Sequence, residues 1–141
     1  MLRQPLIHPP LLRALAAAGH GSRILLADAN YPVSTAVGPR ADVVWLNVAP
    51  GLVDVLTVLD LLTGVVPIEG AAVMQPDGGP RPEIFAAFED RLPDGLRLEG
   101  LDRSAFYRAA RGEDLALAVA TGEQRLFANL LLTVGVVPPG S

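Results

Sequence analysis

A histidine in a glycine turn and an aspartate eight residues later are the residues whose types and spacing indicate chemistry. His20 lies between Gly19 and Gly21, and Asp28 directly follows the apolar run 24–27. An imidazole titrates near neutral pH and transfers protons, and a carboxylate orients or charge-balances a bound group. The two residues therefore indicate one proton-transfer site, provided that the turn folds back over the strand so that both side chains meet at one pocket edge.

Both residues also have ordinary structural interpretations. A histidine in a glycine-rich turn is more often a solvated loop residue than a catalyst, and an aspartate after a strand is often a turn former or a helix cap. Asp28 nevertheless follows four uninterrupted apolar residues. Such a run is typical of a strand that is covered on both faces, and its carboxyl end is the edge where open α/β sheets bind ligands.

Length and composition indicate a single domain over residues 1–141. A chain of this length buries a sizeable core, and half of its residues are hydrophobic while only 18% are charged. An apolar and thinly charged surface tends to be covered by other subunits, so we expect self-association.

Several classes of function are disfavoured by what the sequence contains. The formal charge of −4 and the scattered arginines argue against nucleic acid as a partner. The chain has no cysteine and no lysine, and its two histidines, His8 and His20, are far apart, so thiolate, Schiff-base and zinc chemistry are not expected. Phosphate-binding glycine loops are absent as well. The remaining inventory suits proton transfer without a metal or a cofactor.

The same sequence predicts a cytoplasmic protein without a membrane as partner. The N-terminus lacks the long apolar stretch of a signal peptide, and the most apolar region, 48–68, is interrupted by proline, glycine and aspartate.

Hydrophobic periodicity predicts alternating strands and helices. We expect strands at 24–27, 43–48, 65–74, 96–99, 115–120 and 130–137, and helices at 11–18, 51–62, 83–92 and 104–110. This alternation predicts a three-layer α/β/α sandwich with a mostly parallel, mixed sheet.

Three local features refine this prediction. Gly19 is expected to end the first helix, and Asp102 is expected to cap the helix at 104–110. Asp54 and Asp60 fall on one narrow stripe of the helix predicted at 51–62, which indicates a solvated or interface stripe rather than an acid pair. The loop at 30–40 lines a pocket or makes a subunit contact.

Short segments spread over nearly the whole chain resemble the L-fucose mutarotase and D-ribose pyranase family. They are, in order, Leu15-Ala16, Gly19-His20-Gly21, Asp28-Ala29-Asn30-Tyr31-Pro32, Arg40-Ala41-Asp42, Arg103, Ala105-Phe106-Tyr107-Arg108-Ala109, Thr121-Gly122-Glu123, Asn129 and Gly135-Val136. The resemblance implies an α/β sandwich that assembles into rings, in some members a decamer of two stacked pentamers, with sites between neighbouring subunits. The implied activity interconverts anomers or ring forms of a monosaccharide.

The resemblance also implies roles for individual residues. His20 matches the family's catalytic histidine, Asp28 its sugar-binding aspartate, and Arg103 a basic or imidazole ligand position. The segment Phe127-Ala128-Asn129 matches a sugar-binding segment that usually begins with tyrosine. We therefore expect Asp28 and Asn129 to hold sugar hydroxyls, Arg103 to position an oxygen, and Phe127 to pack on the apolar face of the sugar.

Phenylalanine at position 127 is the main departure from the family pattern. The aromatic face is kept, but the hydroxyl and its hydrogen bond or proton relay are lost. Either that hydroxyl is dispensable, or activity is lower or altered, or Tyr31 or Tyr107 supplies a replacement. Ser22, where fucose members often carry an acid, is a smaller departure. Arg103 also has a plain interpretation as a surface charge beside a helix cap.

The resulting hypothesis is acid/base-assisted sugar mutarotation, with L-fucose favoured as substrate and D-ribose or another aldose as alternatives. A D-ribose pyranase-type exchange between pyranose and furanose forms, a non-catalytic sugar-binding or transport-associated protein, and a purely structural ring remain as rival hypotheses.

Overall fold

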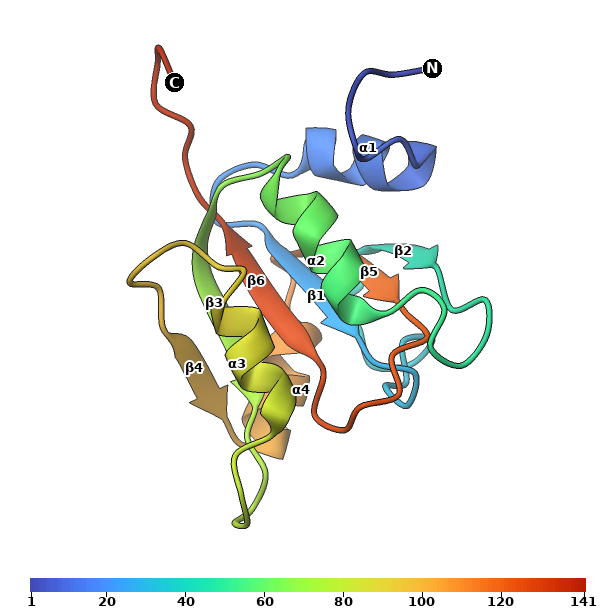
Figure 1. Ribbon diagram of the computed structural model, residues 1–141, viewed down its shortest axis with the longest axis vertical. Helices are drawn as coiled ribbons and strands as arrows, with labels where there is room; N and C mark the ends of the chain where they lie inside the picture. Colours follow the sequence, from blue (N-terminus) through green and yellow to red (C-terminus); the bar gives the residue numbers. More distant parts are fainter.

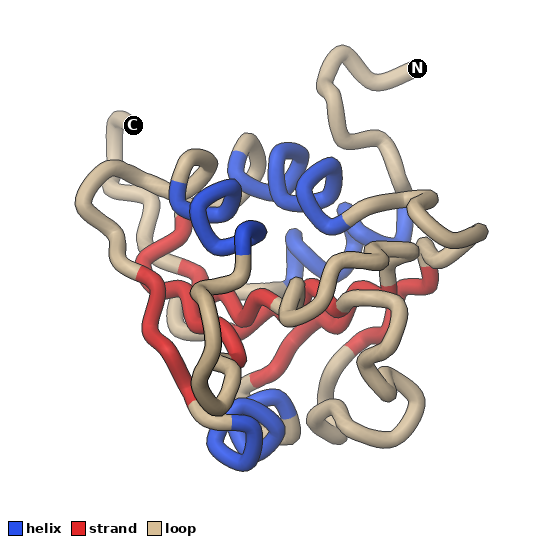
Figure 2. The backbone as a smooth tube through the Cα atoms, turned by 60° about the horizontal axis from the view of Figure 1, so that its bottom comes forward, coloured by secondary structure: helices blue, strands red, loops and turns tan.

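The protein is a three-layer α/β/α sandwich, described by a computed structural model that covers residues 1–141. Helices α1, α2 and α3 cover one face of a central sheet, and α4 covers the opposite face (Figures 1 and 2). The elements follow the chain as α1 (Pro9–Ala17), β1 (Arg23–Ala27), β2 (Asp42–Trp45), α2 (Val55–Thr63), β3 (Ile68–Met74), α3 (Glu83–Glu89), β4 (Leu98–Leu101), α4 (Arg103–Ala110), β5 (Leu115–Ala120) and β6 (Leu130–Val134).

The six strands form one mixed sheet in the order β2-β5-β1-β6-β3-β4. All strands except β6 run in the same direction, and β6 pairs antiparallel with both β1 and β3. The prediction of a mostly parallel, mixed sheet is confirmed. One edge of the sheet therefore collects the carboxyl ends of five strands and the beginning of β6. We call it the carboxyl edge, and the opposite edge the amino edge.

The uninterrupted apolar runs are explained by cores on both faces of the sheet. Ile24 and Leu26 pack in the larger core under α1, α2 and α3. Leu25 and Ala27 pack in the smaller core with Phe106 of α4. A strand whose alternate side chains both meet a core has no polar face, which is the pattern that the sequence shows.

The helix predicted at 51–62 begins four residues later than expected. Asp54 is its N-cap and accepts a hydrogen bond from the Thr57 N–H at 2.8 Å. Gly51 adopts a φ of +82° in the turn that precedes it. The acidic stripe predicted for this helix thus loses Asp54, whose carboxylate satisfies a free backbone donor at the helix start.

The other differences concern where elements begin and end. Strand β3 begins at residue 68 rather than 65, because the N–H groups of Val65 and Val66 bond to the Leu62 carbonyl and extend the end of α2. Strand β4 begins two residues later than predicted, and β2, α3 and β6 end three residues earlier. The predicted bounds 115–120 and the Asp102 cap of α4 are confirmed.

The first helix also differs in detail. It begins at Pro9, two residues before the predicted range 11–18, with proline at its first two positions, and Ala18 rather than Gly19 is its C-cap. His8 caps its start, since Nδ1 accepts a hydrogen bond from the Leu11 N–H at 3.4 Å. None of the four helices is both long and apolar enough to cross a membrane.

Candidate functional site

His20 lies at the amino edge, in the turn between α1 and β1. Gly21 adopts a φ of +82° and its N–H bonds to the Val134 carbonyl at 2.9 Å, which fixes the turn against the end of β6. The His20 imidazole is 59% exposed, and its Nε2 lies 2.9 Å from Oε1 of Glu69 on β3. The turn thus presents an accessible imidazole that is oriented by a carboxylate.

Glu69 is a functional candidate that the sequence did not identify. It is the one charged residue in an otherwise apolar strand, and that isolation was the available signal. Both carboxylate oxygens lie within 3.1 Å of His20 Nε2. An ionised carboxylate only accepts hydrogen bonds, so the contact requires a proton on Nε2 and leaves the lone pair of a neutral imidazole on Nδ1.

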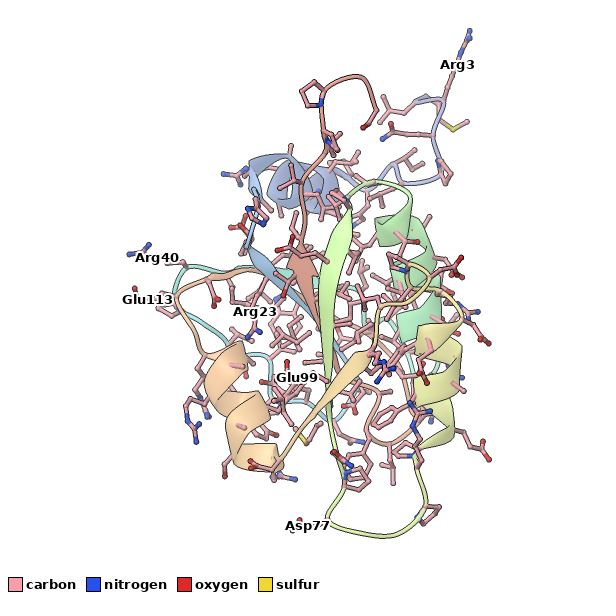
Figure 3. All side chains as sticks on the ribbon, turned by 90° about the vertical axis from the view of Figure 1, so that its left-hand side faces the viewer. Arg3, Arg23, Arg40, Asp77, Glu99 and Glu113 are labelled. Atoms are coloured by element: carbon pink, nitrogen blue, oxygen red, sulfur yellow. The ribbon has the colours of Figure 1, made fainter.

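A shallow recess of about 480 Å³ adjoins the histidine. Polar side chains of Arg40, Asp42, Glu113 and Asp114 line it together with His20. Arg40 lies 3.9 Å from Glu113, and these two side chains project from the surface together (Figure 3). The recess has room and polar groups for a small hydroxylated ligand.

Asp28 and Asn129 form a buried pair at the carboxyl edge. The Asn129 Oδ1 accepts the Asp28 N–H at 2.7 Å, and the Asn129 Nδ2 donates to Asp28 Oδ2 at 3.1 Å. The other carboxylate oxygen accepts the N–H groups of Asn30 and Tyr31. Burial raises the pKa of the Asp28 carboxyl above its ordinary value, and these hydrogen bonds counteract part of that rise.

The loop that carries residues 127–129 is anchored by a second buried carboxylate. Glu123 accepts hydrogen bonds from Nε and Nη2 of Arg125, both at 2.8 Å, and from the Val55 N–H at 3.2 Å. The hydrogen bonds from Arg125 lower the pKa of Glu123 to about 2. Thr121 adds a hydroxyl hydrogen bond to the Ala27 carbonyl at 2.6 Å. Glu123 and Thr121 therefore hold this loop against α2 and β1.

Phe127 and Arg103 line one recess of about 570 Å³ at the carboxyl edge. The backbone of Phe127 is left-handed, with a φ of +58°. Residues other than glycine seldom adopt this conformation, and it often occurs at functional sites. Ala128 is fully buried, backbone included, so it is not exposed to a ligand within one chain. The Tyr31 hydroxyl donates to the Ala36 carbonyl at 2.7 Å and is buried, which leaves it no role as the replacement hydroxyl.

His20 and Asp28 do not meet within one chain. The turn precedes β1 and the aspartate follows it, so the two residues lie at opposite edges of the sheet. A strand rises roughly 3.3 Å per residue, and the five residues of β1 alone separate its ends by roughly 13 Å. The expectation that the turn folds back over the strand is therefore wrong. Asp28, Arg103, Phe127, Ala128 and Asn129 gather at the carboxyl edge, and His20 lies with Glu69 at the amino edge.

The described residues include no group of three or more histidine, cysteine, aspartate or glutamate side chains placed to hold a metal ion. The polar groups at both edges are suited to hydrogen bonding with a small ligand.

These features define the class of protein: a single-domain α/β/α sandwich with polar recesses at both edges of a mixed sheet. The chain belongs to the RbsD / FucU transport protein family, whose model matches residues 1–137. The family predicted from the sequence is thereby confirmed.

Solved structures agree with this assignment. A fucose mutarotase from Streptococcus pneumoniae in complex with L-fucose has a TM-score of 0.81 and 28% identity, with 98% of this chain and 100% of that chain covered. FucU from Bifidobacterium longum has a TM-score of 0.79 and 28% identity, with 94% of this chain and 96% of that chain covered. Bacillus subtilis RbsD complexed with D-ribose shares the fold, with a TM-score of 0.81 and 24% identity. The match covers 98% of this chain and 100% of that chain.

Proposed function

We propose that this protein is a cofactor-independent sugar mutarotase that interconverts the anomers of L-fucose or a related aldose by acid/base-assisted ring opening. The observation that carries the proposal is the exposed His20 imidazole, which Glu69 orients beside an open polar recess. The similarity to a fucose mutarotase in complex with L-fucose supports a monosaccharide as the ligand.

The chemistry requires only proton transfers. His20 Nδ1 takes the proton of the anomeric hydroxyl, whose oxygen forms the carbonyl. The ring oxygen leaves the anomeric carbon with the bonding electron pair and takes a proton from solvent water. The resulting aldehyde rotates about the bond between its first two carbons, and the ring closes on the other face as the protons return. Glu69 accepts the Nε2 hydrogen bond throughout and stabilises the imidazolium that forms on protonation.

The carboxyl edge supplies the binding half of the proposed site. Asp28 Oδ2 and Asn129 Nδ2 each retain hydrogen-bonding capacity beyond their mutual contact, which suits them to sugar hydroxyls. Arg103 donates to a sugar oxygen, and the Phe127 ring packs on the apolar face of the sugar.

We propose that the two halves come together between neighbouring copies of the chain. The separation of the two edges within one chain supports this, because a single sugar cannot bridge the length of β1. Exposed apolar side chains near both edges support it as well. They are Trp45, Val48, Leu52 and Leu126 towards the carboxyl edge, and Val65, Val136 and Val137 towards the amino edge.

Contact between two different edges is heterologous, and a repeated heterologous contact forms a ring when the rotation between copies closes. In such a ring the amino edge of one copy faces the carboxyl edge of the next. Each site then combines His20 of one copy with Asp28 and Asn129 of its neighbour.

Saturation-transfer NMR of L-fucose tests the activity. We expect the wild-type protein to accelerate exchange between the α and β signals, and His20→Ala to return the exchange to the buffer rate. A wild-type rate no faster than buffer contradicts the enzymatic proposal. The same measurement on the pyranose and furanose signals of D-ribose tests the pyranase alternative.

A sugar-binding, transport-associated protein is the second candidate, and the description of the matched family favours it. Calorimetric titration distinguishes it from the enzyme, because saturable sugar binding without accelerated exchange supports binding alone. Absence of both binding and exchange supports a structural ring.

Mixing two inactive variants tests the shared site. When His20→Ala and Asn129→Ala chains are unfolded together and reassembled at equal amounts, about a quarter of the contacts in a heterologous ring pair an intact His20 with an intact Asn129. We expect about a quarter of wild-type exchange from the mixture and none from either variant alone. A mixture as inactive as its components contradicts a site between copies.

A further inference from the structure

Arginines without acidic partners gather on α4 beside the proposed sugar recess. Five arginines of the chain lie within 4.0 Å of a carboxylate: Arg23, Arg40, Arg81, Arg91 and Arg125. Arg103, Arg108 and the C-cap residue Arg111 have no such contact. In a chain with a formal charge of −4, this helix therefore carries a local excess of uncompensated positive charge.

An aromatic platform contacts two of these three arginines. The guanidinium carbons of Arg103 and Arg111 each lie 5.4 Å from the centre of the Tyr107 ring. Tyr107 itself stacks on the buried Tyr31, with centroids 5.2 Å apart and planes at 14°. A guanidinium above an aromatic ring is attracted by the ring face and still has N–H groups free to donate. Arg103 thus begins α4 as an ordered donor rather than a freely moving surface charge.

The recess that contains Phe127 is lined by two of these arginines, Arg103 and Arg108, and by the Ser104 hydroxyl. A second recess of about 700 Å³ continues from it along α4 and shares the same three residues. A ligand that rests against Phe127 therefore has two uncompensated guanidinium groups within the same recess.

The acids of this recess leave those arginines free. Asp102 accepts the Ala105 N–H at 2.8 Å and caps α4. Asp77 lies at the outer end of the loop between β3 and α3 and is exposed (Figure 3). Neither carboxylate lies within 4.0 Å of Arg103 or Arg108. The positive charge is available to a ligand.

We propose that the preferred substrate of this protein is an anionic aldose, a sugar that carries a carboxylate or a phosphate, with Arg103 and Arg108 binding the charged group while the ring rests on Phe127. This inference rests on the proposed mutarotase function. Guanidinium groups bind carboxylate and phosphate through paired N–H donors, a geometry that neutral hydroxyls do not match.

Matched pairs of neutral and charged sugars test the inference. Exchange between anomers is measured by NMR for D-galactose against D-galacturonate and for D-glucose against D-glucose 6-phosphate, with the buffer rate of each sugar subtracted. We expect the charged member of at least one pair to have a kcat/KM about tenfold or more above its neutral partner, since hydrogen bonds to charged groups are the stronger ones. A preference for D-galacturonate indicates a carboxylate as the bound group, and a preference for D-glucose 6-phosphate indicates a phosphate.

Two variants assign the preference to the recess. Arg108→Gln should reduce the ratio of charged to neutral kcat/KM about tenfold. Arg3→Gln removes one arginine charge from the N-terminal segment, far from α4, and should leave that ratio unchanged (Figure 3). Increasing salt should reduce the wild-type preference, because exposed charges are screened.

The outcomes separate this inference from the function on which it rests. Accelerated exchange of neutral sugars with no preference for charged ones overturns the inference and leaves the mutarotase proposal intact. Exchange of neither kind, including L-fucose and D-ribose, overturns both. A change in sedimentation mass for Arg108→Gln without a change in the substrate ratio assigns the arginines to contacts between copies, and also overturns the inference.

Discussion

Replacing Glu123 by glutamine should destabilise the protein in a way that depends on pH. The Glu123 side chain is only 4% exposed, and its two oxygens accept four hydrogen bonds, three from Arg125 and one from the Val55 N–H. Glutamine offers one acceptor oxygen and places an N–H₂ group against the remaining donors. The variant therefore loses the ion pair and leaves buried donors unsatisfied.

The pKa of Glu123 sets the size and the sign of the effect. In the folded protein it is lowered from 4.5 to about 2, chiefly by the hydrogen bonds from Arg125. A lowered folded-state pKa contributes stability that is present above pH 4.5 and is lost as the pH falls towards 2. The difference corresponds to about 3 kcal/mol, and solvent screening at the half-exposed Arg125 reduces this to about 2 kcal/mol.

Urea unfolding followed by circular dichroism at pH 7 and pH 3 measures this contribution. One protein concentration is used throughout, because association shifts apparent stability. Glu113→Gln is the matched control, since Glu113 and Arg40 are both largely exposed and 3.9 Å apart, and its loss should be below about 1 kcal/mol. A Glu123→Gln loss no larger than the control at pH 7, or one of equal size at pH 3, would refute the reasoning.

Three further substitutions address the site. Glu69→Gln removes the carboxylate proposed to orient the His20 imidazole and to stabilise the imidazolium, so kcat for sugar exchange should fall about tenfold or more with little change in KM. Asp28→Asn keeps an oxygen for the backbone N–H groups but places an N–H₂ group against the Asn129 Nδ2 donor, so KM should rise about tenfold in the same NMR assay. Phe127→Tyr restores a hydroxyl at the recess wall, and kcat should increase severalfold; an unchanged kcat shows that the hydroxyl is dispensable.

The architecture was predictable because each buried strand leaves a simple signal. The runs 24–27 and 115–120 are apolar without interruption, and both strands pack on cores at their two faces. The Asp102 cap of α4 was also predictable, because a helix cap is recognised from the residues directly beside it. The order of the strands was not predictable, because an apolar run carries no information about its neighbour. The insertion of the antiparallel β6 between β1 and β3 depends on contacts distant in sequence.

Element ends were less predictable where apolar residues continue past them. Val65 and Val66 are as apolar as the strand that follows, yet their N–H groups bond back to Leu62 at the end of α2. Glu69 shows the corresponding limit for the site. Its role depends on the position of a turn 49 residues earlier in the chain, and nothing in its immediate sequence specifies that contact.

The separation of His20 from Asp28 has a simple physical basis. A strand is extended, so a turn that precedes it and a residue that follows it lie at opposite ends unless a long connection returns over the sheet. Only three residues separate Ala18, the C-cap of α1, from Ser22, directly before β1, which is too short a connection for such a return. The geometry that the residue types suggested is therefore not available within one chain.

Division of the site between two edges makes assembly part of the proposed catalysis. In an isolated chain the imidazole of His20 is more than half exposed, and no residue of the proposed binding half at the carboxyl edge is near it. Acid–base catalysis requires the base to be held within hydrogen-bonding distance of the reacting hydroxyl, and exclusion of water strengthens the interactions that hold it there. The proposed contact between the amino edge of one copy and the carboxyl edge of the next meets both requirements in one step. It covers exposed side chains such as Trp45 and Val136, and it places the base of one copy opposite the binding groups of the next.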